Sequence, residues 1–547
     1  MNSPFSKLKS WLPVIAAAIM IAASGVSARA DLLLKSGDRV VFYGDSITEQ
    51  RLYTRYIQQY VYCRYPELKV HFFNAGWGGD TAAGALKRVE RDVLPLKPTL
   101  VTLFFGMNDG GYRAIDDGIL NNYTTTMEGL IKLLTDKGIR VVVFTPGCVD
   151  TDKNPGLKPY NATLETLGKT AIDLATKYKC AYADIHHPML AFQTAQKAIN
   201  GAYSLSLDGV HPNPGGHQVM ASTMLSALGV ASMPPLGTVD LKTSQTTGDV
   251  KLVSNANGVV SLSATPANIP YWVDPTSIAD VNACGLANLV GQKLTVKGLD
   301  AGDYAVTIGS YITATTSKDL EQGISILGTY SDAGQKLDDF VAMKENLYFT
   351  AWRQIQIPYD GTPGISEAYS GLISSDDGLN TALYSFKPSA PVMIMIAGKP
   401  KGPNLALHKK YVAVDDNKYN WGIGGLTDGS WEASATHCFA SGDADAFPKT
   451  VTIDLEQATQ VGAVVLGVPP FGATKTIEVS VSADGNTFTP EGTHEFACEQ
   501  EARYMFAFTP VQARYVRLTY PDHYTTNQQY GPNFVFTTEA EVYVSAK

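Results

Sequence analysis

Residues 40–48 of this sequence, V-V-F-Y-G-D-S-I-T, place a serine where it could act as a nucleophile. The apolar run 40–43 indicates a buried strand that ends at Gly44, and the spacing of the tyrosines that follow indicates a helix. A serine on a tight strand-to-helix turn lies at the carboxyl edge of a sheet, where open α/β folds bind ligands. Alternatively, Asp45 and Ser46 form an ordinary turn that caps the helix. This stretch alone leaves both interpretations open.

Three further segments carry polar residues directly after predicted strands or near the end of the same unit. They are 74–81 (N-A-G-W-G-G-D-T), 106–111 (G-M-N-D-G-G) and 208–213 (D-G-V-H-P-N). Each segment by itself reads as a turn. Their order along the chain and their expected position at one edge of a sheet favour a common site over unrelated turns.

The elements that must position these residues alternate between strand and helix. Apolar runs predict strands at 39–43, 70–74, 99–105, 139–145 and 180–185. Helix-length segments lie between them at 52–64, 82–92, 119–137 and 160–179. Five strands separated by helices imply a parallel sheet covered on both faces.

The four polar segments together resemble the SGNH, or GDSL-type, esterase superfamily. The first block of that family matches Gly44-Asp45-Ser46-Ile47, with isoleucine in place of leucine, and the glycine of its second block matches Gly79. Its third block, G-x-N-D, matches residues 106–109, and its last block, D-x-x-H, matches Asp208 and His211. The resemblance implies a flavodoxin-like, three-layer α/β/α hydrolase domain over residues 31–230.

The matched residues have the types that ester hydrolysis by a serine requires. Serine at its ordinary pKa is a weak nucleophile, so a base must take its proton, and His211 is the candidate because imidazole as a side-chain type is suited to that role near neutral pH. Asp208 can reach the far ring nitrogen and stabilise the imidazolium. By resemblance, the oxyanion is stabilised by the backbone N–H groups of Ser46 and Gly79 and by the side-chain amide of Asn108. No cofactor is expected for this chemistry.

Other residues near these blocks have weaker claims. Asp45 and Asp109 are expected to stabilise loops rather than react. Trp77 could stack on a sugar ring, or it could simply pack against its neighbours. The pair His186-His187 suggests a metal, but with no carboxylate at a suitable spacing a structural role is favoured.

Bulk properties exclude several classes of function. The chain has 547 residues, 45% hydrophobic and 17% charged, which is typical of folded domains and too long for a single core. A net charge of -9 argues against a general nucleic-acid partner. Residues 1–30 combine early lysines, a short apolar run and an A-R-A site, which predicts a cleaved signal peptide and export to the periplasm or outside the cell. An uncleaved anchor is the alternative, and no later segment predicts a transmembrane span.

The six cysteines show no spacing typical of a zinc site. Export would permit disulfides, and Cys438 with Cys498 is the first pair to consider. Buried free thiols are an equally good interpretation.

Residues 231–400 are predicted to form a β-rich accessory region with a helix that packs on the hydrolase domain. Alternating residues at 294–299 and 304–308 flank the turn 300–303 and predict a hairpin. Residues 331–352 read as a helix. Such a region is similar to those that follow some hydrolase domains of this type, and no chemistry is assigned to it.

A linker at 399–403 is followed by strands and turns typical of a β-sandwich jelly roll over residues 401–547. This module resembles the discoidin, or coagulation-factor type C, galactose-binding family at 404–406 (N-L-A), 426–431 (L-T-D-G-S-W), 482–486 (S-A-D-G-N), 513–518 and 541–543. The resemblance implies carbohydrate binding, for which Trp421 and Trp431 could stack on sugars unless they belong to the core. It also implies a structural calcium, with Asp428 and Glu539 as candidate ligands.

These observations lead to the hypothesis of an exported serine esterase that removes acyl groups, most simply acetyl groups, from a polysaccharide. A lipase, arylesterase or thioesterase of the same superfamily is the alternative within the enzymes, and sulfate-ester chemistry is not excluded by the residues. An inactive glycan-binding protein is the alternative from another class, although every block position is retained.

Overall fold

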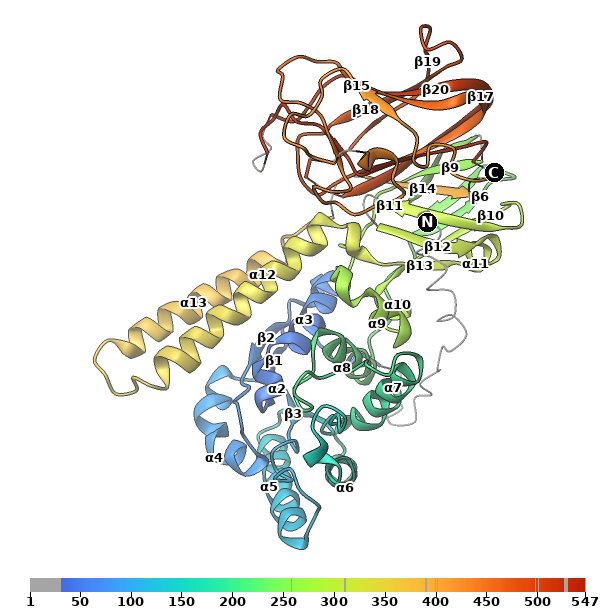
Figure 1. The fold of residues 1–547 in the computed structure, drawn as a ribbon. Coiled ribbons are helices and arrows are strands. Elements are labelled where there is room, and N and C mark those ends of the chain that lie inside the picture. Colours follow the sequence, from blue (N-terminus) through green and yellow to red (C-terminus); the bar gives the residue numbers. More distant parts are fainter. Residues whose placement is uncertain are drawn as a thin grey trace.

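The computed structural model of the protein describes residues 31–546, except residues 257, 309–310, 389–390, 399, 401, 423, 497, 500 and 526–529. The predicted signal peptide, residues 1–30, therefore lies outside the described residues, as do Lys399 and Lys401 of the predicted linker. Figure 1 shows the region predicted to be a jelly roll (residues 401–547, orange to red) at one end and the region predicted to be a hydrolase domain (residues 31–230, blue to green) at the other, and these two names are kept below. Two β-sheets and a long helical pair lie between them.

The hydrolase domain is built on a five-stranded parallel sheet. Its strands have the order β2-β1-β3-β4-β5, which is the order of flavodoxin-like folds. The strands are β1 (Arg39–Gly44), β2 (His71–Asn74), β3 (Leu100–Phe104), β4 (Arg140–Phe144) and β5 (Ala181–Ala183). The predicted fold class of this region is confirmed, and both ends of every predicted strand lie within two residues of the expected bounds.

Helices cover both faces of this sheet because successive strand residues point to opposite sides. Phe42 and Phe72 face a core that includes apolar residues of α3 and α8, whereas Val41 and Phe73 face a core with α4 and α5. The helices are α2 (Ser46–Glu49), α3 (Leu52–Arg64), α4 (Ala82–Asp92), α5 (Asp117–Asp136), α6 (Tyr160–Lys177), α7 (His186–Ile199) and α8 (Pro214–Ala227).

The accessory region contains two sheets whose buried side chains continue the core of the hydrolase domain. Leu294 of one sheet and Ile394 of the other belong to the same apolar cluster as Phe42. The first sheet has the order β13-β10-β6-β7, with β6 (Gly237–Asp240), β7 (Gln245–Gly248), β10 (Gln292–Lys297) and β13 (Ile324–Ile326). The second has the order β12-β11-β14-β9-β8, with β8 (Val250–Ala256), β9 (Val259–Ala264), β11 (Asp303–Ile308), β12 (Tyr311–Thr316) and β14 (Val392–Gly398).

The hairpin predicted around residues 300–303 is wrong in its pairing. Both strands form, as β10 and β11, but they belong to different sheets: β10 pairs with β6 and β13, and β11 pairs with β12 and β14. A turn signal between two alternating segments indicates a change of direction but does not select the partner strand. Each strand here is paired on both sides within its own sheet, so the connection crosses from one sheet to the other.

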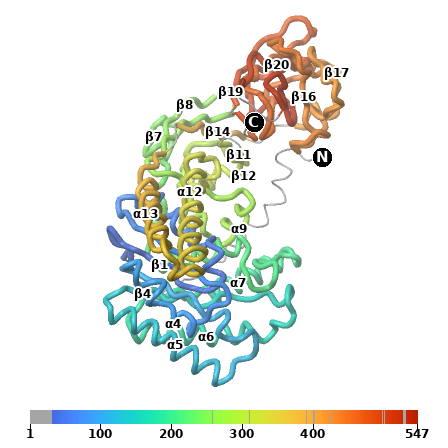
Figure 2. The backbone as a smooth tube through the Cα atoms, turned by 90° about the vertical axis from the view of Figure 1, so that its left-hand side faces the viewer, coloured from blue at the N-terminus to red at the C-terminus, as the bar shows by residue number. Residues whose placement is uncertain are grey.

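Three short helices, α9 (Ile278–Ala283), α10 (Ala287–Val290) and α11 (Ser317–Gln322), complete the sheets. A long antiparallel helical pair then leaves them and lies along the hydrolase domain (Figures 1 and 2). It consists of α12 (Asp332–Phe349), the π-helical turn η7 (Thr350–Gln356) and α13 (Ile365–Leu383). The predicted helix 331–352 corresponds to α12, and α13 was not predicted.

Buried polar contacts fix the helical pair to the hydrolase domain. On α3, the Thr54 hydroxyl and the Gln58 amide both donate to Glu345 Oε1, at 2.7 and 2.6 Å. Arg55 forms an ion pair with Asp338. Because these groups are largely removed from water and hydrogen-bonded to one another, α12 is part of the same folded unit as the hydrolase sheet.

The carboxyl-terminal module consists of antiparallel strands, as expected for a galactose-binding jelly roll. Its main sheet has the order β15-β17-β20-β18-β19, with β22 beside β17, and β16 pairs with β21. The strands are β15 (Tyr411–Ala413), β16 (Phe439–Ala440), β17 (Lys449–Val468), β18 (Thr476–Ser482), β19 (Thr489–Glu495), β20 (Ala502–Tyr520), β21 (Phe536–Thr537) and β22 (Glu539–Tyr543).

An apolar contact joins the module to the accessory region. Met395 and Ala397 of β14 pack with Trp431, Val465 and Met505 of the module in one buried cluster. The two regions therefore share an interface in addition to the chain connection.

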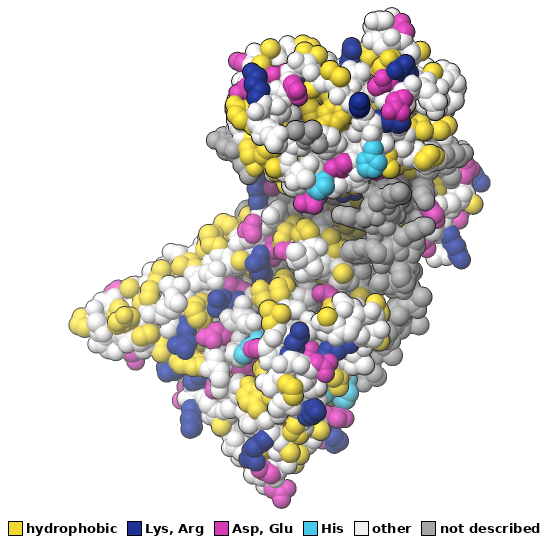
Figure 3. All heavy atoms as spheres, viewed as in Figure 1, with side chains coloured by type: hydrophobic (Ala, Val, Ile, Leu, Met, Phe, Trp, Pro, Cys, Tyr) yellow, Lys and Arg dark blue, Asp and Glu magenta, His cyan; other side chains and the backbone are white. Residues whose placement is uncertain are grey.

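Basic and acidic side chains are interspersed over the face drawn in Figure 3. None of the helices between residues 31 and 546 that the structure describes is both long and apolar enough to cross a membrane. All six cysteines are free thiols, so Cys438 and Cys498 are not paired.

Candidate active site

The turn after β1 presents Ser46 as the first residue of α2. Asp45 caps this helix, and its carboxylate accepts the N–H of Ile47 at 3.0 Å. Position 44 has no room for a side chain, because a Cβ at Gly44 would lie 2.1 Å from Thr48 Oγ1 and 2.9 Å from the Phe104 carbonyl oxygen. Both interpretations of this stretch therefore apply: Asp45 is the helix cap, and Ser46 is free to point its hydroxyl elsewhere.

The hydroxyl of Ser46 contacts the imidazole of His211. Ser46 Oγ lies 2.8 Å from His211 Nε2, and His211 Nδ1 lies 2.7 Å from Asp208 Oδ2. This arrangement links serine, imidazole and carboxylate in one hydrogen-bonded chain, although Ser46 and His211 are 165 residues apart. It can withdraw the serine proton as the oxygen attacks an electrophile.

Hydrogen bonds keep Asp208 ionised. Burial alone would raise its pKa, but the hydrogen bonds from His211, from the N–H groups of Val210 and His211 and from Ser206 outweigh that effect and hold the pKa well below its usual range. Its Oδ1 accepts both N–H groups at 2.8 Å and the Ser206 hydroxyl at 3.0 Å. Its other oxygen is left for His211.

A second set of contacts supports this loop from the segment after β4. The N–H of Asp150 donates to the Gly209 carbonyl at 2.8 Å, and its buried carboxylate receives the Ser204 hydroxyl and the Lys197 ammonium. The Asp208–His211 segment is thereby fixed to β4 and α7 as well as to its own turn.

Two oxyanion-hole candidates lie on adjoining loops. Gly79 has φ +73, a left-handed conformation that favours glycine, and it is exposed. The side-chain amide of Asn108 donates one N–H to the Asp80 carbonyl at 2.9 Å. An amide nitrogen carries two hydrogens, so one N–H of Asn108 remains to bind a developing negative charge.

Tyr112 fixes which way that amide points. Its hydroxyl donates to Asn108 Oδ1 at 2.8 Å, so the oxygen and nitrogen of the amide each have a defined partner. Tyr112 adopts φ 57, which is unusual for a residue with a side chain, and its ring packs on Tyr160 with centroids 5.1 Å apart. We infer that the backbone of Tyr112 is held in this conformation by the contacts of its side chain.

Asp45 and Asp109 accept backbone hydrogen bonds, as expected for residues that stabilise loops. Asp109 Oδ1 accepts the N–H of Ala82 at 2.9 Å. Burial raises the pKa of Asp45 and of Asp109 to about 7 each, and the mutual proximity of these carboxylates and of Asp80 adds to the effect. Neither group contacts the Ser46 hydroxyl.

His217 lies behind the triad and stays neutral. Its ring is fully buried, which lowers its pKa to about 3, with the nearby His211 adding to the shift. Its Nδ1 accepts the N–H of Tyr53 at 3.3 Å, and its Nε2 lies 3.1 Å from Gln50 Oε1. It therefore supports the helix that follows the nucleophile and adds no charge beside His211.

Trp77 packs instead of presenting an open face. The guanidinium of Arg353 lies 3.6 Å from the centroid of its ring, and Trp352 meets it edge-on at 6.1 Å. Of the two roles considered for Trp77, these contacts favour packing over sugar stacking.

The two tryptophans of the jelly roll differ in exposure. Trp431 is 4% exposed, packs in the interface with β14 and has Arg503 over its ring, so it belongs to the core. Trp421 is half-buried and lies edge-on to Phe471, Tyr530 and Phe536. Trp421 remains the better candidate for carbohydrate contact.

The candidate calcium ligands lie near each other: Glu539 is the first residue of β22, and Asp428 comes from the segment before β16. Glu539 is fully buried, its Oε2 accepts the N–H of Gly429 at 3.1 Å, and its Oε1 has no hydrogen-bond partner. Burial, with Glu541 and Asp428 nearby, raises the pKa of Glu539 to about 10. Asp428 is engaged by His437 at 2.6 Å and by the N–H of Ser430 at 2.7 Å. A divalent cation would stabilise a buried carboxylate oxygen that has no hydrogen-bond partner and lies beside other carboxylates.

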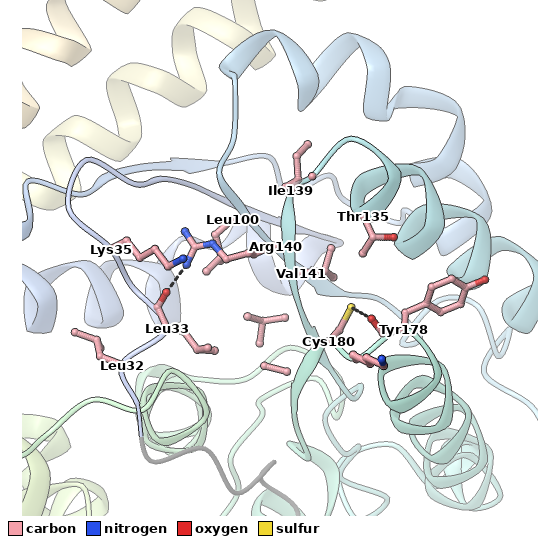
Figure 4. A pocket seen from close by; sticks show the side chains of 14 residues that line it. Leu32, Leu33, Lys35, Leu100, Thr135, Ile139, Arg140, Val141, Tyr178 and Cys180 are labelled. Atoms are coloured by element: carbon pink, nitrogen blue, oxygen red, sulfur yellow. Dashed lines mark hydrogen bonds between the residues drawn. The ribbon is translucent and has the colours of Figure 1, made fainter.

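Two surface cavities lie away from the triad. One, of about 340 Å³, is lined by residues at the amino ends of β3, β4 and β5, including Leu100, Arg140 and Cys180 (Figure 4). This is the edge of the sheet opposite to Ser46. Burial raises the pKa of Cys180 to about 11, so this cavity offers a thiol and no reactive thiolate.

The other cavity, of about 350 Å³, is lined by His186, His187, Asp184 and Glu165. The expectation that no carboxylate lies at a suitable spacing from the histidine pair is wrong. His187 Nδ1 lies 2.6 Å from Asp184 Oδ2, and its Nε2 lies 3.6 Å from Glu165 Oε1. His186 is bound instead to the Gly147 carbonyl, at 2.9 Å. These partners fix the start of α7 and agree with the structural role expected for both histidines.

Several residues of the site could not be found from the sequence. Tyr112 follows the G-x-N-D block by three positions, which gives no signal of a hydrogen bond to its asparagine. Arg353 and Asp150 come from segments outside all four blocks. Their roles depend on tertiary contacts, which a spacing pattern does not encode.

Comparison with known proteins agrees with these observations. Residues 42–219, which include all five proposed catalytic residues, match the model of the GDSL-like lipase/acylhydrolase family. Residues 413–518 match the model of the NedA-like, galactose-binding domain.

Individual proteins that are similar to parts of the chain include an esterase and a solved structure. An acetylxylan esterase of Geobacillus stearothermophilus is 26% identical over 216 residues, which are 36% of this chain and 95% of that protein. The structure of a gut microbial diltiazem-metabolizing enzyme aligns with a TM-score of 0.55 at 20% identity and covers 68% of this chain and 99% of its own. That likeness shows a shared fold that extends well beyond the hydrolase domain.

Proposed function

We propose that this chain, a carboxylic ester hydrolase with a GDSL-like lipase/acylhydrolase domain at residues 42–219, is an exported serine esterase that removes acetyl groups from a polysaccharide. The observation that carries the proposal is the hydrogen-bonded chain from Ser46 through His211 to Asp208. The substrate and the place of action go beyond that observation and are argued separately below.

In the first half of the reaction, Ser46 Oγ attacks the acyl carbon while His211 Nε2 takes the hydroxyl proton. The carbonyl oxygen becomes an oxyanion, and the N–H groups of Ser46, Gly79 and Asn108 stabilise it. His211 then gives its proton to the sugar oxygen as the ester bond breaks, so a free sugar hydroxyl leaves and the acyl group stays on Ser46. Asp208 holds the imidazolium throughout.

In the second half, water attacks the acyl-enzyme. His211 takes a proton from the water, the same donors stabilise the second oxyanion, and the proton returns to Ser46 Oγ as acetate leaves. The enzyme ends in its initial state, and no metal or organic cofactor takes part in these steps.

Four observations support a carbohydrate substrate. The relative from Geobacillus stearothermophilus is named for the esters of xylan, and residues 413–518 match a galactose-binding domain. The sequence of residues 1–30 predicts export, which would bring the enzyme to polysaccharides outside the cytoplasm. The half-buried Trp421 is the side chain through which the module would contact a sugar.

The proposal is tested by acetate release from acetylated xylan and other acetylated glycans, measured for the wild type and for Ser46→Ala. We expect the variant to lose at least about 10³-fold of the activity, because loss of a catalytic nucleophile leaves only residual catalysis. Ser226→Ala, on the exposed face of α8, is the matched control and should be as active as the wild type. Rates on acetyl and octanoyl esters, measured in parallel, distinguish the acetylesterase from a lipase.

We further propose a structural calcium in the jelly roll, held by Asp428 and Glu539. The partnerless Oε1 of Glu539 and the neighbouring carboxylates support it. When bound, the ion would neutralise this buried acidic group, and it would take no part in ester hydrolysis.

A further inference from the structure

One turn of the hydrolase domain connects two of the proposed oxyanion donors. We call residues 77–80 the Gly79 turn. It contains the Gly79 N–H itself, and its Asp80 carbonyl accepts the N–H of Asn108 at 2.9 Å. The N–H of Trp77 donates to the Gly44 carbonyl at 3.1 Å, which anchors the turn beside the nucleophile. A displacement of the turn would therefore move both donors relative to Ser46.

Arg353, from the helical pair, contacts this turn and the nucleophile helix together. Its guanidinium lies 3.6 Å from the centroid of the Trp77 ring, and its Nε lies 3.6 Å from Glu49 Oε1. Glu49 is the last residue of α2, which begins with Ser46. The other carboxylate oxygen of Glu49 would lie 2.8 Å from a Cβ at Gly78. Arg353 thus joins the two segments whose relative position defines the oxyanion hole.

The backbone that carries Arg353 is itself fixed and unusual. Residues Thr350–Gln356 form a π-helical turn, a rare conformation that is frequently found at functional sites. Within it Trp352 is buried and donates to Asp92 of α4 at 3.3 Å. At the end of α12, Phe349 packs under the guanidinium of Arg51, at 4.2 Å. These contacts hold the residues that directly precede Arg353 against the hydrolase domain.

Two other arginines approach Trp77 but have different partners. Arg88 and Arg91 lie 5.5 Å from the ring centroid. Arg88 is bound to Asp80 and to the Gly44 and Ala75 carbonyls, and Arg91 is bound to Asp92. Arg353 makes the close stacking contact, and its Nε has no hydrogen-bond partner. The contacts that the structure shows for its guanidinium are the stack on Trp77 and the ion pair with Glu49.

We propose that Arg353 is a positioning residue for the oxyanion hole, acting through Trp77 and Glu49 on the Gly79 turn. The inference rests on the proposed esterase function. If Arg353 has this role, the helical pair of the accessory region contributes to catalysis by the hydrolase domain. Arg353 contacts no reacting atom, so its effect should appear in the chemical step and not in substrate binding.

The test compares three variants: Arg353→Met, Arg353→Lys and the control Arg64→Met. Arg353→Met keeps most of the side-chain length but removes the planar, charged guanidinium. Arg64 also stacks on an aromatic ring, Tyr65, at 4.8 Å, but it lies at the far end of α3. For Arg353→Met we expect kcat on a soluble acetyl ester to fall about tenfold with KM unchanged, because donors are displaced without being removed. Arg353→Lys should recover part of the loss, and Arg64→Met should match the wild type.

Two further measurements separate positioning from a general structural role. Affinity for a boronic acid that forms a tetrahedral adduct with Ser46 should fall in proportion to kcat, while the melting temperature of Arg353→Met stays near that of Arg64→Met. Trp77→Leu should lower kcat by a similar factor, and the double variant Trp77→Leu, Arg353→Met should be no worse than Trp77→Leu alone, because both changes act through one contact.

Three results would overturn the proposal: a raised KM with unchanged kcat, which would mean direct contact with substrate; fully additive effects of the two substitutions; or no change in kcat. Ser46→Ala is measured alongside. If that variant retains activity, the serine mechanism itself fails, whereas a neutral Arg353→Met beside an inactive Ser46→Ala refutes only the positioning role.

Discussion

At the scale of single residues, the site depends on groups that orient the catalytic side chains. Asn108 can serve the oxyanion only if its amide nitrogen faces the substrate, and the Tyr112 hydroxyl, by donating to Oδ1 at 2.8 Å, selects that orientation. Tyr112 is 37% exposed, so its ring can be altered with little effect on the core.

Replacing Tyr112 by phenylalanine should lower kcat by about tenfold or less, since it weakens one oxyanion donor without removing it. The ring is kept, so KM for a small acetyl ester should change little. Tyr178→Phe, which removes a hydroxyl bound to Glu128 on the outer surface, is the matched control. A variant with unchanged kcat would show that Asn108 holds its orientation through Asp80 alone.

The proposed catalytic residues could be predicted because they lie in four short blocks whose pattern and order carry the family resemblance. Ser46, Gly79 and Asn108 follow β1, β2 and β3, whereas Asp208 and His211 lie between α7 and α8. Tyr112 and Arg353 could not be predicted in the same way, since their partners are set by the packing of side chains around a left-handed residue and a π-helical turn.

At the scale of elements, the strands of the catalytic sheet could be predicted from the sequence, whereas helix α13, which packs beside the hydrolase domain, could not. The strands of the hydrolase domain are continuous apolar runs, and their bounds follow from that pattern. Helix α13 is rich in serine, glycine, aspartate and asparagine, so its sequence resembles a loop. It is helical because it packs along α12 and places Asp376 and Asn380 against His71 and Tyr62 of the hydrolase domain.

The interface between α12 and α3 should make stability depend on pH. Burial raises the pKa of Glu345 from 4.5 to about 7. The folded state therefore holds this proton more tightly than the unfolded chain does. The corresponding stabilisation is fully present below about pH 4.5 and is lost as pH rises through about 7, and one pKa unit corresponds to about 1.4 kcal/mol.

Replacing Glu345 by glutamine removes this titration and keeps an acceptor for Thr54 and Gln58. The melting temperature of the variant minus that of the wild type should therefore increase between pH 4.5 and 8. Glu367→Gln, at an exposed position of α13, should show no such trend. A constant difference for Glu345→Gln over this range would contradict the raised pKa.

At the scale of the whole molecule, the jelly roll is docked on the accessory region and does not hang from a free linker. Trp431, one of the two tryptophans considered for sugar binding, is part of this interface with β14. The sequence identified the module from its strands and turns, but the partner of its apolar surface lies on β14, which no local pattern indicates.

Removal of calcium should lower the thermal stability of the jelly roll. With EDTA, we expect a lower melting temperature for the jelly roll transition, restored by excess calcium, because a ligand that binds only the folded state stabilises it. Glu539→Gln should melt at the same temperature with and without calcium. If the wild type is insensitive to both EDTA and calcium, Asp428 and Glu539 hold no ion.

The central claim is that Ser46, activated by His211, cleaves acetyl esters of a polysaccharide. The most direct measurement is acetate released from acetylated xylan by the wild type, Ser46→Ala and Ser226→Ala at equal concentration. The account predicts release by the wild type and by Ser226→Ala and almost none by Ser46→Ala, with all three variants folded by circular dichroism. Equal release by Ser46→Ala and the wild type would contradict the mechanism, and absence of release by the wild type from every acetylated glycan tested would contradict the substrate.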